Sequence, residues 1–125
     1  MKSVKTTEQR VSGYLLSLKF NPRLMGFKYL REAILLAAQK QNKPFTLKKD
    51  IYPALLAKYQ IKAANLERNI SNAIDNAFLA VDINEMERLF GNTISSKTGK
   101  PTVKELIAAA SVHILLHGLE TPALS

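Results

Sequence analysis

Cysteine is absent from the 125 residues of this chain. Its absence excludes disulfide bonds, thiolate nucleophiles and cysteine-based zinc sites. Long apolar runs are also absent. No stretch approaches the roughly 18 consecutive apolar residues of a membrane span, and the basic start of the chain is not followed by the apolar run of a secretory signal. These absences predict a cytoplasmic protein that does not enter a membrane.

Acidic residues are scarce in the first half of the chain. Residues 1–62 contain thirteen Lys or Arg against three acids, whereas residues 63–96 contain two against five, and the whole chain has a formal net charge of +8. Each Lys or Arg beside a phosphate releases condensed counterions, so this surplus favours a polyanionic partner. Charge alone leaves open the alternative of a basic protein that is merely soluble.

Apolar residues recur at three- and four-residue steps, which indicates helices. We predict helices over residues 7–18, 24–41, 50–59, 63–80, 84–90 and 102–117. Asp50 is expected to cap the third helix, and Pro53 is tolerated in its first turn. Thr102 and Glu105 have the spacing of a capping box at the start of the last helix, and Gly118 is expected to end it. The prediction is one domain, residues 1–125, of the all-α class with six helices.

The third and fourth predicted helices have the proportions of a helix-turn-helix over about residues 50–80. In that motif the second helix enters the major groove of double-stranded DNA. The polar side of residues 63–80 is rich in Asn and also carries Arg68, at steps of three and four residues. Asn pairs bidentately with adenine and Arg with guanine, so this side predicts base reading. A solvated face is the alternative, although such a face more often carries Glu and Lys.

Lysines surround this candidate reading helix. Some lie before or around the turn, and others cluster at the start of the last helix, whose free amides also favour a phosphate. The predicted phosphate-binding residues are Lys48, Lys49, Lys58, Lys62, Lys97, Lys100 and Lys104.

Catalytic patterns are weak in this sequence. His113 and His117 stand four apart on the last predicted helix and form a conceivable metal pair, but the sequence offers no evident third ligand beside them. There is no Gly-rich phosphate loop and no G-x-S-x-G motif. We therefore expect a protein that is not an enzyme and needs no metal or cofactor.

Five short blocks of sequence form a recognisable series. They are GFKYLREAI at residues 26–34, IYP at 51–53, LERNI at 66–70, LFGNT at 89–93 and KPT at 100–102. In this order, and with almost no gaps over about residues 6–117, they resemble the C-terminal DNA-binding domain of the sporulation master response regulator of endospore-forming bacteria. Five blocks in register make the resemblance specific.

The resemblance implies a six-helix fold and a transcription regulator that binds short DNA boxes as tandem copies. The family's reading helix contacts bases through a Glu-Arg pair, which matches Glu67 and Arg68, and through an Arg one turn later, which is Ser71 here. Another family Arg, early in the helix, is Asn65 here. DNA binding is therefore expected to persist, but the family's own box does not follow from the resemblance, and Lys100, by its place in the KPT block, matches a phosphate contact. The predicted base-reading set is Asn65, Glu67, Arg68, Asn69, Ser71 and Asn72.

Two further alternatives remain at this level. The family's regulator carries a phosphorylated receiver domain ahead of this module and this sequence has none, so the chain is either an excised fragment or a stand-alone relative, such as a DNA-binding accessory of a plasmid, phage or conjugative element. A protein-interaction module acting through residues 82–119 is the second alternative. The resemblance implies that the region after the reading helix touches RNA polymerase, so DNA binding and protein interaction are compatible in one protein.

Overall fold

The computed structural model describes residues 6–40, 43–79 and 101–124, and this part of the chain is helical without any strand. The elements are α1 (Thr7–Ser17), α2 (Met25–Gln39), the π-helical turn η1 (Leu47–Ile51), α3 (Tyr52–Tyr59), α4 (Ala63–Ala77) and α6 (Val103–Leu124). The all-α prediction is therefore confirmed for these residues. The predicted short helix over residues 84–90 lies outside them, so the count of six helices is not established.

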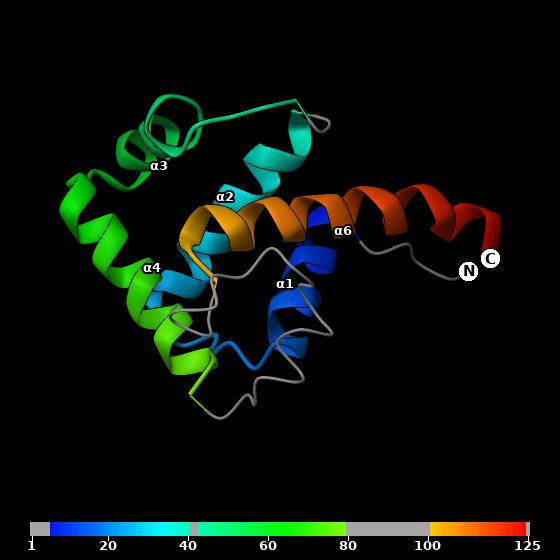
Figure 1. Ribbon diagram of the computed structural model, residues 1–125, viewed down its shortest axis with the longest axis horizontal. Helices are drawn as coiled ribbons and strands as arrows, with labels where there is room; N and C mark the ends of the chain where they lie inside the picture. Colours follow the sequence, from blue (N-terminus) through cyan, green and yellow to red (C-terminus); the bar gives the residue numbers. More distant parts are fainter. Residues whose placement is uncertain (1–5, 41–42, 80–100, 125) are drawn as a thin grey trace.

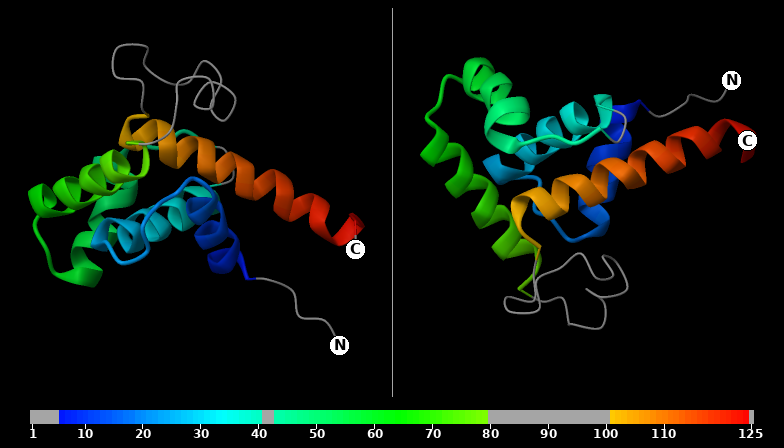
Figure 2. Two further views of the ribbon diagram at one scale, coloured as in Figure 1. Left: turned by 90° about the horizontal axis from the view of Figure 1, so that it is seen from below. Right: turned by 45° about the horizontal axis from the view of Figure 1, so that its top comes forward.

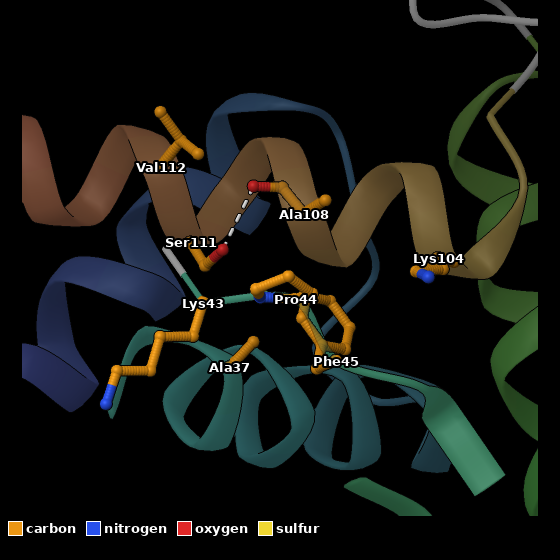
Figure 3. Close-up of a pocket in the computed structure, with 8 residues that line it drawn as sticks. All are labelled: Ala37, Lys43, Pro44, Phe45, Lys104, Ala108, Ser111 and Val112. Carbon is orange, nitrogen blue, oxygen red and sulfur yellow. Dashed lines mark hydrogen bonds between the residues drawn. The ribbon is translucent and has the colours of Figure 1, made fainter. Parts of the chain in front are cut away.

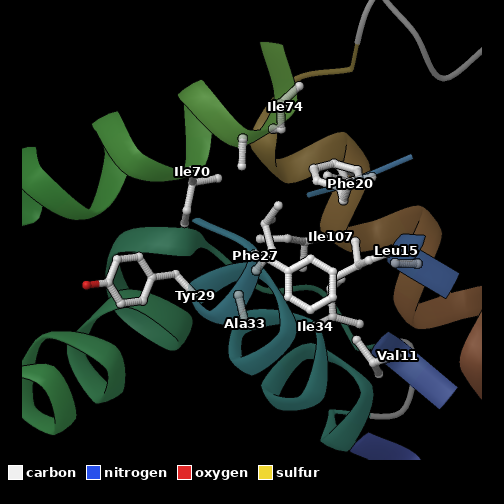
Figure 4. Close-up of a cluster of buried hydrophobic side chains, with 14 of the residues drawn as sticks. Val11, Leu15, Phe20, Phe27, Tyr29, Ala33, Ile34, Ile70, Ile74 and Ile107 are labelled. Carbon is white, nitrogen blue, oxygen red and sulfur yellow. The ribbon is translucent and has the colours of Figure 1, made fainter. Parts of the chain in front are cut away.

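The central element is α2, which packs against α1, α4 and α6 and also meets α3. In Figure 1, α6 crosses α2, and α4 lies at the edge of the molecule. The helical spacing of apolar residues in α2 places Leu30 and Ile34 in the core, where both are fully buried. They meet Leu15 of α1, Ile70 of α4 and Ile107 of α6 in one cluster (Figure 4). Full burial of each such side chain contributes about 1.5–3 kcal/mol to folding.

Capping boxes start the first and last helices. The Thr102 hydroxyl accepts from the Glu105 amide at 3.1 Å, and the Glu105 carboxylate accepts from the Thr102 amide at 2.8 Å. This confirms the capping box predicted there. Thr6 and Gln9 form the same reciprocal pair at the start of α1. Each box provides partners for two backbone amides that would otherwise have none at the end of a helix.

The start of the third helical segment differs from the prediction. Asp50 is not its cap, because the turn η1 precedes α3 and begins after Thr46, whose hydroxyl accepts from the Lys49 amide at 3.3 Å. The Asp50 carboxylate instead reaches back to the Thr46 amide, 2.7 Å away. Pro53 has no N–H for the Lys49 carbonyl, and its ring would clash with that carbonyl in an α-helix, so the turn widens to the π form.

Several helix ends also differ from the predicted ones. The backbone of α6 stays helical to Leu124 rather than ending at Gly118. A single Gly costs a helix only about 1 kcal/mol, which is not enough to end it. By contrast, α4 is shorter than predicted and ends at Ala77, three residues earlier. The chain leaves the helix there and places the buried Phe78 ring edge-on against Phe20, with 5.9 Å between ring centroids.

Candidate nucleic-acid interface

A short turn joins α3 to α4 and gives the pair the arrangement of a helix-turn-helix. Gln60 ends α3 in the left-handed conformation, with φ 53° and ψ 49°, and residues 61–62 lead into α4. This conformation costs a residue other than Gly roughly 1–2 kcal/mol, so the neighbouring packing must hold the turn. The views in Figure 2 show α4 at the edge of the molecule, and its inner side packs against α2.

The apolar residues of α4 determine which of its sides is available to a partner. Its buried residues repeat at three- and four-residue steps and pack against α2: Leu66, Ile70, Ala73, Ile74 and Ala77. The opposite side is exposed, and five of the six predicted base-reading residues lie fully on the surface: Asn65, Glu67, Arg68, Ser71 and Asn72. The sequence-based assignment of the polar side of this helix therefore agrees with the structure.

The sixth predicted reader, Asn69, differs from the others. It is half-buried, and its side-chain Nδ2 donates to the backbone carbonyl of Asn65 at 2.8 Å. Its backbone carbonyl lies against Gly26 of α2. An amide that is already bonded to its own helix has one donor fewer for a base edge than the exposed amides of Asn65 and Asn72.

Glu67 lies beside the first turn of α3. Burial, and to a lesser extent the Glu67 carboxylate, raise the pKa of the Tyr52 phenol to about 12. Tyr52 is only 3% exposed and belongs to the buried core. The Glu67 carboxylate is therefore near enough to the first residue of α3 for its charge to act on the Tyr52 phenol.

The amino-terminal end of α4 has the features of an anion site. Its cap residue, Lys62, is exposed and provides no side-chain hydrogen bond to the first amides of the helix. Ala63 and Ala64 are exposed too, and their small side chains leave those amides accessible. Free amides at a helix start attract phosphate through their hydrogens and through the helix dipole.

The predicted phosphate-binding lysines do not form one group in the structure. Lys48 and Lys49 are exposed on η1, directly before α3. Lys58 is not directed toward α4, because its Nζ lies 3.0 Å from Glu32 Oε1 of α2. This hydrogen bond raises the pKa of Lys58. Lys97 and Lys100 lie outside the described residues.

Lys104 faces the segment between α2 and η1. Its Nζ lies 5.4 Å from the centre of the Phe45 ring, a distance that permits a cation–π contact. Both side chains line a cavity of about 220 Å³ between this segment and α6 (Figure 3). Lys104 thus contacts Phe45 of its own chain and does not lie on the outer side of α4.

Gly26 and Tyr59 both pack against a neighbouring helix, and the sequence predicts such a role only for Tyr59, on the buried side of its helix. Gly26 touches α4 so closely that a Cβ there would overlap the Asn69 carbonyl oxygen and lie 2.7 Å from the Ala73 Cβ. Tyr59, the last residue of α3, meets Tyr29 of α2 edge-on, with 5.1 Å between ring centroids. Gly26 belongs to the GFKYLREAI block, but periodicity alone does not show which helix crosses it.

The structure gives little support to the metal pair considered above. The His113 ring packs against Tyr14 of α1, with 4.5 Å between ring centroids. Within the described part of the chain, no three His, Asp or Glu side chains come together as metal ligands do. The His117 side chain lies outside the described residues. None of the described helices combines the length and the apolar character that crossing a bilayer requires.

Comparison with known families gives a match over most of the chain. A family model described as "Sporulation initiation factor Spo0A C terminal" matches residues 11–114. The matched stretch is most of the chain and includes both helices of the helix-turn-helix and the start of α6.

Proposed function

Because the chain belongs to the Spo0A C-terminal family, the DNA-binding domain of a transcription regulator, we propose that it reads double-stranded DNA in a sequence-specific manner. The observation that carries the proposal is the outer side of α4. It exposes Asn65, Arg68 and Asn72 on one stripe, while the opposite side of the same helix is buried. These side-chain types match adenine and guanine edges in the major groove.

In the proposed mechanism, phosphate contacts position the domain and base contacts provide specificity. Lys48, Lys49 and Lys62, together with the open amides at the start of α4, bind the DNA backbone on either side of the groove. Arg68 then donates to a guanine, and Asn65 and Asn72 pair with adenines. Lys58 contributes less than the sequence suggests, because Glu32 already balances its charge.

The proposed target differs from the family's own DNA box. Asn65 and Ser71 stand where the family reads DNA with Arg, so two guanidinium groups are missing from the reading helix. Neither side chain can replace the bidentate contact of Arg with guanine or its charge toward phosphate. We therefore propose that the preferred box retains the guanine read by Arg68 and differs at the positions facing Asn65 and Ser71.

Two finer points rest on family membership: tandem binding on DNA and contact with RNA polymerase through the region after α4, within residues 82–119. In the described part of that region, Val112 and Leu116 of α6 are apolar and exposed. One turn apart on the helix, they provide a surface suited to protein rather than to phosphate. The spacing of repeated boxes on bound DNA would test the tandem arrangement.

The salt dependence of DNA binding tests the proposed mechanism. With three lysines and Arg68 near phosphates or base edges, we expect the logarithm of the association constant to fall with the logarithm of salt concentration at a slope of about −3 or steeper, because each neutralised phosphate contributes about −0.9. The slope is measured by fluorescence anisotropy on a labelled duplex between about 50 and 200 mM salt. Binding that hardly changes with salt would contradict phosphate anchoring and favour a protein partner.

A further inference from the structure

Lys28, near the start of α2, lies where this helix meets both α3 and α4. Its Nζ is 5.6 Å from the centre of the ring of Tyr59, the last residue of α3. Two positions earlier on α2, Gly26 lies against the backbone of Asn69 in α4. These contacts place the exposed amine of Lys28 beside the turn that leads into the proposed reading helix.

The charges around the Tyr59 ring do not balance. Lys58 also approaches this ring, with its Nζ 5.5 Å from the ring centre, and Glu32 balances its charge at 3.0 Å. Glu32 stands four residues after Lys28 on α2, a spacing at which the two could pair, but its carboxylate is bonded to Lys58 instead. Within the part of the chain that the structure describes, Lys28 forms no ion pair. Two amines thus share one carboxylate, and the amine of Lys28 is the one left over.

The Tyr59 ring holds the Lys28 amine without neutralising it. The face of an aromatic ring attracts a cation through its quadrupole, but the ring carries no net charge. The ring itself is fixed by its edge-on contact with Tyr29. A side chain that is held in this way loses less freedom when it binds an anion. Lys28 therefore offers a positioned positive charge that no acid of the described residues cancels.

We propose that Lys28 anchors a phosphate of the DNA backbone on the α2 side of the reading helix. A helix that lies in the major groove, which is about 12 Å wide, has a phosphate backbone on each side of it. The contact carries no information about base sequence, because every nucleotide presents the same phosphate. The inference rests on the proposed DNA-binding function and adds to it a contact on a helix outside the helix-turn-helix.

The test compares Lys28→Ala with the wild type on two duplexes, one carrying a box selected by the wild-type protein and one with the same bases scrambled. We expect the variant to bind both duplexes about two- to fivefold more weakly, in keeping with the loss of one exposed charge contact. Between about 50 and 200 mM salt, the slope of the logarithm of the association constant should become shallower by about 0.9. Lys28→Arg keeps the charge and should retain the slope.

Two further variants serve as controls. Lys43→Ala removes an exposed lysine just beyond the opposite end of α2, and it should change the affinity and the slope much less than Lys28→Ala. Glu32→Gln removes the carboxylate that balances Lys58 while keeping its shape. It should act in the opposite direction to Lys28→Ala, with tighter binding to both duplexes and a steeper slope.

Several outcomes would overturn the proposal. Wild-type affinity and slope in Lys28→Ala, or an equal loss in Lys43→Ala, would reduce Lys28 to its share of the net charge. A loss confined to the selected box would make Lys28 a base-reading residue instead. No tightening in Glu32→Gln would show that phosphate does not approach these side chains. If the wild type binds neither duplex, the proposed function fails first, before any variant is measured.

Discussion

Replacing Gly26 by Ala is expected to lower the free energy of unfolding by about 2 kcal/mol or more, although Ala is the better helix former. The new Cβ would overlap the Asn69 carbonyl oxygen, which is backbone and cannot rotate away, and would lie 2.7 Å from the Ala73 Cβ. α2 and α4 must therefore separate, and the core between them loosens. This cost exceeds the gain of about 1 kcal/mol that Ala brings to a helix interior. Urea unfolding followed by circular dichroism measures the difference.

Gly13 is the matched control, because it also lies inside a helix. A Cβ at this position would have no neighbour within 4 Å, so Gly13→Ala should raise the free energy of unfolding by up to about 1 kcal/mol. The two substitutions are chemically identical and are expected to have opposite signs. Equal effects would show that α2 and α4 do not pack as closely as the structure has them.

Replacing Arg68 by Ala is expected to weaken binding to the preferred box by about 1–3 kcal/mol, or roughly five- to 150-fold, and to relax the base preference at one position. Arg68 is exposed at the centre of the outer side of α4, and it forms no ion pair with any residue that the structure describes. Its guanidinium is therefore available for a bidentate contact with guanine. Anisotropy titrations on the box and on single-base variants of it measure both effects.

Two controls separate base reading from charge. Arg68→Lys keeps the positive charge but loses the planar pair of donors, so it should retain most of the salt dependence and still lose the base preference. Arg23→Ala removes the same charge from an exposed position between α1 and α2, and should leave the preference intact. A full base preference in Arg68→Ala would exclude Arg68 from the reading role.

Much of the fold could be predicted because its signals are local. In α4, the spacing of Leu66, Ile70 and Ile74 identified the buried side, and burial of all three confirms it. The polar side followed directly from the same periodicity. The capping box of Thr102 and Glu105 was recognisable because both partners lie within one turn of each other.

The features that could not be predicted depend on contacts between distant residues. Gly26 is significant only because α4 crosses α2 at that point, and the sequence does not show where the two helices cross. The sequence predicts that Lys58 is available to DNA because its partner, Glu32, lies 26 residues earlier on another helix. The cap at Thr46 is not predicted for a different reason. Its acidic partner, Asp50, comes four residues later, whereas the acid of a capping box comes three residues after the cap.

We propose above that the outer side of α4 reads the sequence of double-stranded DNA. Selection from a pool of random duplexes at about 150 mM salt, near physiological ionic strength, tests it most directly. We expect the wild-type protein to enrich a defined box containing a guanine whose selection disappears in Arg68→Ala. No enrichment by the wild type, or the same box enriched by both proteins, would contradict it.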